Sequence, residues 1–148
     1  MKRVLSIQDI SCIGKCSLTV ALPIISAMGI ETSILPTSIL STHTMFNDFT
    51  FRDLTDDMEP IKKHWQKEGF SFDAIYTGYL GSEKQITLVK DYFKTFGNTC
   101  KYIIVDPAMA DNGKLYSGFD KDFPLKMAKL CKYADVILPN ISEAAFDD

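Results

Sequence analysis

The stretch Tyr102-Ile103-Ile104-Val105-Asp106-Pro107 places four β-prone residues directly before a carboxylate and a proline. A short apolar run of this kind is typical of a buried strand in a parallel sheet. The runs Ala74–Thr77 and Val136–Leu138 are similar, and helix-forming segments lie between the three. Strands that alternate with helices form right-handed βαβ units. The sequence therefore predicts an α/β fold with a mostly parallel central sheet.

The same patterns extend to the rest of the chain. We expect further strands at Arg3–Gln8 and Ser33–Leu40, and helices at Ser17–Met28, Asp56–Glu68, Ser82–Phe96 and Phe123–Lys132. Pro23 predicts a kink or a late start in the first helix, and Pro36 predicts an edge or bent strand. At Asp147-Asp148, where the chain ends, another helix is expected to begin.

Composition excludes several classes of protein. A length of 148 residues suits one domain, and 46% hydrophobic with 24% charged residues is ordinary for a globular protein. The net charge of −3 argues against a general nucleic-acid binder. No apolar run approaches the ~20 residues that span a membrane. Asp9 interrupts the first apolar run too early for a secretory signal, so we expect a cytoplasmic protein with four reduced cysteines.

Polar loops follow three of the predicted strands, at Thr77–Ser82, Asp106–Gly113 and Pro139–Glu143. In an open parallel sheet, loops at the carboxyl ends of strands line the ligand crevice. Carboxylates, an amide and a tyrosine in these loops therefore suggest a binding site. The alternative is that they are simple polar linkers.

The acidic residues of the second loop have two interpretations. Asp106 follows a buried strand and is placed to hold Mg²⁺ or a monovalent cation, or else it accepts hydrogen bonds within its own Asp-Pro turn. Asp111 supplies a second carboxylate near the same cation, or it initiates the turn at Asn112-Gly113.

Asn140 and Glu143 also have two interpretations. The amide can cap a helix while the carboxylate reaches back, as in a capping box. Equally, the pair can orient phosphate or a metal-bound water. The spacing alone favours the cap.

Tyr79, between Gly78 and Gly81, offers a face on which a flat ring can stack. Asp9 and Gly14 follow the first predicted strand, and Ser41–Thr44 follows the second. The sequence contains no GxGxxG after the first strand, no GxxxxGK[ST] and no GxSxG. A dinucleotide fold, a Walker-type phosphate loop and a nucleophile elbow therefore have no support.

Taken together, six segments in order resemble the pyridoxal/pyridoxamine kinase family of the ribokinase-like superfamily. They are Ser6–Asp9 with Gly14, Leu40–Thr44, Tyr76–Ser82, Asp106–Met109, Asn112–Tyr116, and Ala134–Asn140 with Glu143. The resemblance implies a ribokinase-like three-layer sandwich, of which residues 1–148 form the N-terminal part of a single kinase domain. It covers about the N-terminal half of the family's length.

The family implies ATP-dependent phosphorylation of the 5′-hydroxymethyl group of vitamin B6, in salvage to pyridoxal 5′-phosphate. By position, Asp9, Thr44 and Tyr116 would contact the pyridine substrate and Tyr79 would stack near it. The residues that would place Mg²⁺, a monovalent cation (K⁺ or Na⁺) and the ATP phosphates are Asp106, Asp111 and Glu143, with Asn140 beside them. The complete protein would be a homodimer.

Three departures from the family pattern matter. Asp9 stands where many members carry Ser, which would favour an amine-bearing vitamer, and Ala110 replaces a glycine whose loop must adjust if that position needs a positive φ. The family's general base, an aspartate in a Gly-Thr-Gly-Asp motif, does not occur in this sequence. We therefore expect no catalytic base in these residues and no kinase activity from them alone. A hydroxymethylpyrimidine kinase and a non-catalytic vitamin-binding or interaction module are the alternatives.

Overall fold

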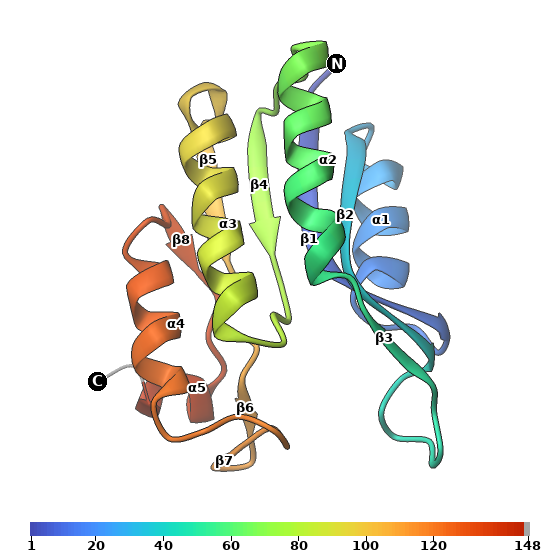
Figure 1. Ribbon diagram of the computed structural model, residues 1–148, viewed down its shortest axis with the longest axis vertical. Helices are drawn as coiled ribbons and strands as arrows, with labels where there is room; N and C mark the ends of the chain where they lie inside the picture. The colour runs from blue at the N-terminus through green and yellow to red at the C-terminus, as the bar shows by residue number, and fades with distance from the viewer. Residues whose placement is uncertain (147–148) are drawn as a thin grey trace.

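A computed structural model describes residues 1–146 and shows a six-stranded sheet in the order β3-β2-β1-β4-β5-β8 (Figure 1). Its strands are β1 (Arg3–Ile13), β2 (Glu31–Thr42), β3 (Phe51–Asp53), β4 (Ala74–Thr77), β5 (Tyr102–Val105) and β8 (Val136–Ile137). A small hairpin pairs β6 (Ala110–Asp111) with β7 (Lys114–Leu115). The helices are α1 (Leu18–Ala27), α2 (Thr55–Glu68), α3 (Glu83–Phe96), α4 (Phe123–Cys131) and α5 (Ile141–Phe146), with a 3₁₀ turn at Gly97–Thr99.

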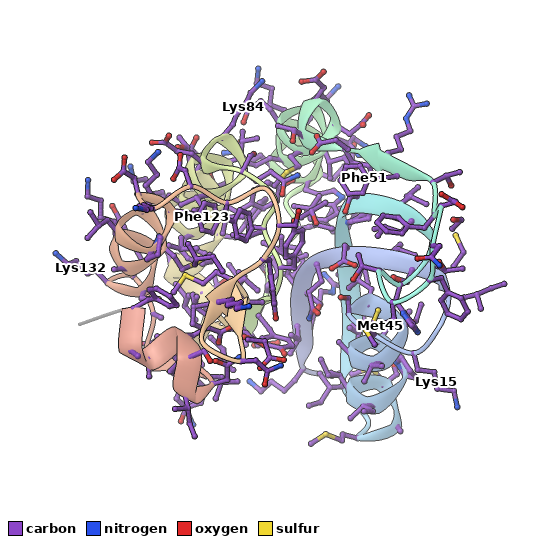
Figure 2. All side chains as sticks on the ribbon, turned by 90° about the horizontal axis from the view of Figure 1, so that it is seen from below. Lys15, Met45, Phe51, Lys84, Phe123 and Lys132 are labelled. Atoms are coloured by element: carbon purple, nitrogen blue, oxygen red, sulfur yellow. The ribbon has the colours of Figure 1, made fainter. Side chains whose placement is uncertain are left out.

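Helices cover both faces of this sheet. All neighbouring strands are parallel except β3, which runs antiparallel to β2. Helices α2, α3 and α4 lie on one face, and α1 packs against β1 and β2 on the other (Figures 1 and 2). The predicted α/β fold with a mostly parallel central sheet is confirmed.

The core forms between the sheet and helices α2, α3 and α4. Leu5, Ile7 and Ile75 are fully buried on the sheet, and Val89 and Met127 meet them from the helices. Alternate strand residues point to one face, whereas the helices bury residues three or four apart. Figure 2 shows Phe123 inside this layer, with Lys84 and Lys132 pointing outward. This packing fixes the strands whose ends carry the candidate site.

The structure corrects several boundaries. Strand β1 continues to Ile13, so Asp9 lies within the strand and not after it. The reason is that β2 also extends, to Thr42, and pairs with β1 along its length. The hairpin β6–β7 and strand β3 are not among the predicted elements, whereas α5 begins directly after Asn140, as the capping-box interpretation implies. Helix α5 spans Ile141–Phe146. The helix expected to begin at Asp147-Asp148 lies outside the described residues.

Neither Pro23 nor Pro36 ends the helix or strand that contains it. Pro23 lies inside α1, five residues after its start, so the predicted late start is wrong. Beside Pro36 the pairing of β1 with β2 shifts register, from Gln8↔Pro36 to Ile10↔Ile39. This places one extra residue in β2, which is a β-bulge. Since β3 pairs only with Ser38–Leu40, Pro36 stands where β2 is still the outer strand, as the sequence predicts.

Candidate functional site

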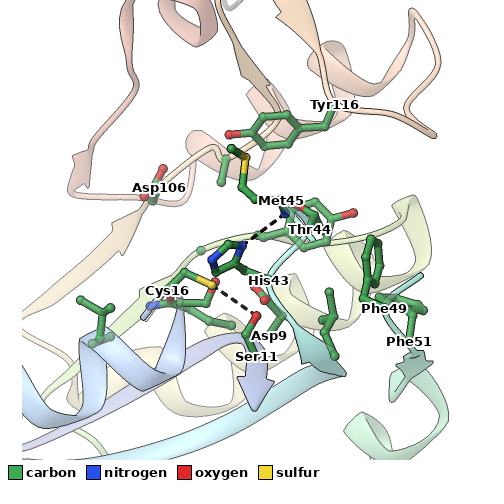
Figure 3. Close-up of a pocket in the computed structure, with 18 of the residues that line it drawn as sticks. Asp9, Ser11, Cys16, His43, Thr44, Met45, Phe49, Phe51, Asp106 and Tyr116 are labelled. Atoms are coloured by element: carbon green, nitrogen blue, oxygen red, sulfur yellow. Dashed lines mark hydrogen bonds between the residues drawn. The ribbon is translucent and has the colours of Figure 1, made fainter. Parts of the chain in front are cut away.

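A cavity of about 1210 Å³ opens at the carboxyl ends of β1, β2, β4 and β5. Five of the predicted site residues line it, namely Asp9, Thr44, Tyr79, Asp106 and Tyr116. Figure 3 shows Asp106 and Tyr116 on one side of the opening, with Asp9 and Ser11 on the other. Asp111, Asn140 and Glu143 do not line this cavity. The rule that strand ends share a crevice therefore brings together residues that lie far apart in the sequence.

Asp9 is a buried carboxylate on the wall of this cavity. It is 7% exposed, and burial raises the pKa of its carboxyl, an effect that a hydrogen bond from Ser17 partly offsets. No ion pair within residues 1–146 involves Asp9. Ser17 itself has a φ of 52°, a conformation that costs free energy outside glycine. The chain thus holds an unneutralised carboxylate where a ligand can reach it.

Aromatic rings form a second wall. The Tyr79 ring stacks on Phe119 at 5.7 Å between centroids, and its centroid lies 6.4 Å from that of Tyr116. Burial is the first cause of the raised pKa of Tyr79, followed by the charges of Asp9 and Asp53. Both phenols therefore stay protonated at neutral pH and can donate a hydrogen bond. A flat ring beside them would find both stacking surface and polar partners.

Asp106 has the most perturbed carboxyl of the site. Burial raises the pKa of Asp106 to about 6, and the negative charge of Glu143 adds to the increase. Its backbone N–H donates to the Thr77 carbonyl at 3.1 Å, which fixes the residue at the end of β5 beside the end of β4. A carboxylate held in this way is stabilised by any cation that comes between it and Glu143.

Asn140 and Glu143 form the capping box that their spacing favours. The Asn140 side chain accepts from Glu143 N at 2.9 Å, and Glu143 Oε2 accepts from Asn140 N at 2.9 Å. Glu143 Oε1 also accepts from Met109 N at 3.1 Å, and Asn140 Nδ2 donates to the Ala110 carbonyl at 2.8 Å. The pair therefore also anchors the loop that follows Asp106.

Asp111 lies in the exposed hairpin and accepts a hydrogen bond from Asn112 N at 2.8 Å. Positive φ values at Asn112 and Gly113 are typical of a two-residue hairpin turn. These contacts favour the turn interpretation for Asp111. Ala110 is buried in β6 and is not among the residues with positive φ, so its alanine requires no adjustment of the loop.

The acidic residues fit a cation only in part. Within residues 1–146, no group of three or more His, Cys, Asp or Glu side chains is arranged to hold a metal ion. Both oxygens of Glu143 already accept backbone hydrogen bonds, whereas Asp106 faces the cavity. Mg²⁺ in proteins often takes only one or two carboxylates and keeps water or phosphate ligands. Asp106, with Glu143 beside it, fits that mode of binding.

Sequence reasoning missed other residues of the cavity. Gln8, Ser17 and the apolar residues Met45, Phe49 and Phe51 also line it. Met45 and Phe49 lie in the segment that joins β2 to β3, and Phe51 is the first residue of β3. We call residues 43–51 the flap. Only the density of aromatic residues in Met45–Phe51 could have indicated a shared surface, because the segment has no strand or helix periodicity.

At Gly78, the backbone of the cavity wall lies close to the Gln8 side chain. A Cβ atom on this residue would lie 2.8 Å from the Gln8 side chain, which is itself buried. We therefore expect Gly78→Ala to lower the free energy of unfolding by about 1–3 kcal/mol, since overpacking forces neighbours to move. Thermal or urea unfolding measures the change.

Gly81→Ala in the same loop is the matched control, because its Cβ would meet neighbours only at 3.7 Å or more. Equal losses of stability in the two variants would contradict the packing argument.

Comparisons with known proteins show which family and which folds this chain resembles. A family model described as phosphomethylpyrimidine kinase matches residues 30–146. A Bacteroides thetaiotaomicron protein of that description, crystallised with pyridoxal, is 46% identical with a TM-score of 0.93, over 98% of this chain and 51% of that one. The pyridoxal kinase of Lactobacillus plantarum is 37% identical with a TM-score of 0.94, over 99% of this chain and 52% of that one.

A curated relative, the pyridoxal kinase of Actinobacillus pleuropneumoniae, is 28% identical over 97% of this chain and 52% of its own length. The chain thus spans about half the length of the relatives it matches. In the described residues, no helix has both the length and the apolar character needed to cross a membrane.

Proposed function

Because the chain belongs to the phosphomethylpyrimidine kinase family and groups with the pyridoxal kinases of the ribokinase-like superfamily, we propose a kinase that phosphorylates vitamin B6. The hydroxymethyl oxygen of pyridoxal, pyridoxamine or pyridoxine attacks the γ-phosphorus of ATP. The bond from that phosphorus to the bridging oxygen breaks, and ADP leaves. The hydroxyl proton passes to a general base, which the family resemblance puts outside these residues.

One observation supports this proposal above the others. Asp9 and Tyr79 line the same cavity as Asp106, so ring-binding groups and a phosphate-side carboxylate share one space. Phosphoryl transfer depends mainly on positioning and on neutralising charge. In our proposal, Asp9, Thr44, Tyr79 and Tyr116 hold the ring. Asp106 faces the phosphates, and Asn140 and Glu143 lie behind it, on the same side of the site.

Asp106 and Glu143 would hold Mg²⁺, which supplies charge neutralisation to the triphosphate. We extend this set to Asp111 and to a monovalent cation only through the family resemblance. The charges of Glu143, Asp111 and Asp106, in that order after burial, all contribute to the raised pKa of Tyr116. This electrostatic coupling supports a common acidic environment next to the ring.

Asp9 bears on the choice of vitamer. A buried carboxylate without an ion pair in the described residues is best satisfied by a cationic group of the ligand. Pyridoxamine carries an ammonium group at neutral pH where pyridoxine carries a hydroxyl. We therefore propose that this kinase prefers pyridoxamine to pyridoxine.

A hydroxymethylpyrimidine kinase is the second candidate, since the matching family model has that type of description. Isothermal titration of the chain with the three B6 vitamers and with hydroxymethylpyrimidine separates the two. We expect the vitamers to bind more tightly. Tighter binding of the pyrimidine would support the second candidate, and absence of binding by all four would contradict both.

A non-catalytic vitamin-binding module is the third candidate, and a turnover assay separates it from a kinase. In this assay, a polypeptide corresponding to the second half of the Bacteroides relative is added to the chain together with ATP and vitamer. Vitamer binding without ATP-dependent phosphorylation in that mixture would favour the module. Phosphorylated vitamer, detected by chromatography, is the result that the kinase proposal predicts.

A further inference from the structure

Gln85 is a buried amide that the function proposed above leaves unexplained. It stands in the first turn of α3 and is 1% exposed. Its Oε1 accepts from Gly81 N at 2.8 Å. Its Nε2 donates to the Thr37 carbonyl at 3.0 Å and to Thr55 Oγ1 at 3.1 Å. One side chain thus joins the loop after β4 to β2 and to the start of α2.

Helix capping does not account for these contacts. Ser82 already caps α3 by accepting from Gln85 N at 3.2 Å. In a capping box, the third-position side chain would return to the N–H of the cap residue itself. Here the amide oxygen reaches Gly81 instead, one residue earlier, and the amide nitrogen turns toward segments 30 and 48 residues away.

The acceptor side of Gln85 faces the loop that carries Tyr79. A Cβ atom on Gly81 would lie 3.7 Å from the Tyr79 ring and 3.8 Å from Gln85 Oε1. Gln85 thus holds the Gly81 N–H two residues after Tyr79, and a side chain at Gly81 would be at ordinary van der Waals distance from the Tyr79 ring. This hydrogen bond restrains the backbone of the loop that carries Tyr79.

The donor side of Gln85 contacts β2 and the chain at the end of β3, the two strands that the flap connects. Strand β2 leaves from Thr37 toward Thr44, and β3 returns from Phe51 to Asp53. Asp53 Oδ2 lies 3.5 Å from Gln85 Nε2, and Asp53 Oδ1 accepts from Thr55 N at 2.7 Å. The two chain segments that carry the flap thus meet the same amide that holds the Tyr79 loop.

We propose that Gln85 is a positioning residue, which sets the gap between Tyr79 and the flap and so the width of the slot for the substrate ring. It acts through these two walls and does not itself line the cavity. The inference rests on the proposed function only for the identity of the ring. The fixed placement of Tyr79 can be measured without any ligand.

The test compares Gln85→Met, which keeps the size and removes both hydrogen-bonding groups, with Ser82→Ala, which weakens the same helix start. NMR of ¹³C-labelled tyrosine reports the Tyr79 ring, whose signals depend on the neighbouring Phe119 ring. We expect Q85M to shift the Tyr79 signals and S82A to leave them in place. Unchanged Tyr79 signals in Q85M would overturn the inference, whatever the ligand.

Titration with pyridoxine adds the second readout. Q85M should lower the affinity about 10-fold in the wild-type background and less than about 2-fold in Tyr79→Ala, since the effect passes through that ring. If Q85M and S82A lose affinity for pyridoxine in the same proportion to their decrease in melting temperature, Gln85 has a merely structural role and the inference is overturned. No binding by the wild-type chain would instead count against the proposed function, and the NMR result would still decide this one.

Should Q85M fail to fold, Gln85→Glu serves as the second variant. It keeps the acceptor for Gly81 N and loses the donors to Thr37 and Thr55. We expect Q85E to weaken pyridoxine binding while the Tyr79 signals move less than in Q85M. Full retention of affinity in Q85E would show that the flap contacts do not position the site.

Discussion

Asp106→Asn is expected to make the chain more stable at neutral pH and to lower the rate of phosphoryl transfer. Burial and the charge of Glu143 raise the pKa of Asp106 to about 6 from an ordinary value of 3.8. The folded state therefore binds the proton more tightly than the unfolded state. Stability falls as the pH rises from about 4 to about 6, and the loss persists above that range.

The loss in free energy of unfolding follows from the pKa shift of Asp106. It is smaller than the full shift implies, because Asp106 is partly exposed and solvent screens its charge. We expect a loss of about 1–2 kcal/mol at pH 7.5. The neutral amide should recover it, which corresponds to a rise of about 3–6 °C in Tm for a chain of this size. Thermal unfolding at pH 4 and pH 7.5 measures the difference, with the exposed Asp57→Asn as control. An equal Tm for variant and wild type at pH 7.5 would refute the electrostatic argument.

The same substitution should damage function. In the mixture with the second-half polypeptide of the Bacteroides relative, loss of the carboxylate that we propose on the phosphate side is expected to lower kcat by a factor of about 10²–10³. Stability and activity would then change in opposite directions, which a residue with a purely structural role cannot produce. Retained kcat in D106N would remove Asp106 from the phosphate side of the site.

Asp9→Ser is expected to remove the preference for pyridoxamine over pyridoxine. A buried carboxylate that pairs with an ammonium group contributes about 1.5–3 kcal/mol, so its removal should lower pyridoxamine affinity at least 10-fold. Affinity for pyridoxine, which has no ammonium group, should change less than about 3-fold. Isothermal titration of both ligands with wild type and variant gives the ratio directly.

Asp9→Asn is the matched control, because it keeps the shape and removes the charge. It should lose the same preference as the serine variant if charge is the cause. Both variants should also melt higher than wild type, since burial disfavours the Asp9 carboxylate. A pyridoxamine-to-pyridoxine ratio that is the same in all three proteins would contradict the assigned role.

Much of the fold could be predicted because its local signals agree with its packing. Strands β4 and β5 have the predicted bounds, and α3 begins after the predicted Ser82 cap. The extension of β1 past Gln8 could not be predicted, since Asp9 and Ser11 are polar and are buried only by tertiary packing. Strand β3 also lacked a signal, because all three of its residues are exposed and pair only with β2.

The candidate site shows the same division. Asp106 and Tyr79 follow strands, and the rule for parallel sheets was enough to place them in one crevice. Thr44 lies in the polar segment Ser41–Thr44 that follows the second predicted strand, but its contact with the ring came from the family resemblance. Tyr116 came only from that resemblance, since it follows no predicted strand. The contacts of Gln85 join segments up to 48 residues apart, and no local sequence signal encodes such a pairing.

A crystal structure with pyridoxamine tests the account most directly. We predict ring density between Asp9 and Tyr79, with the ammonium group at the Asp9 carboxylate and the hydroxymethyl group directed toward Asp106. Density on any other surface, or a cavity that stays without ligand at millimolar pyridoxamine, would contradict it.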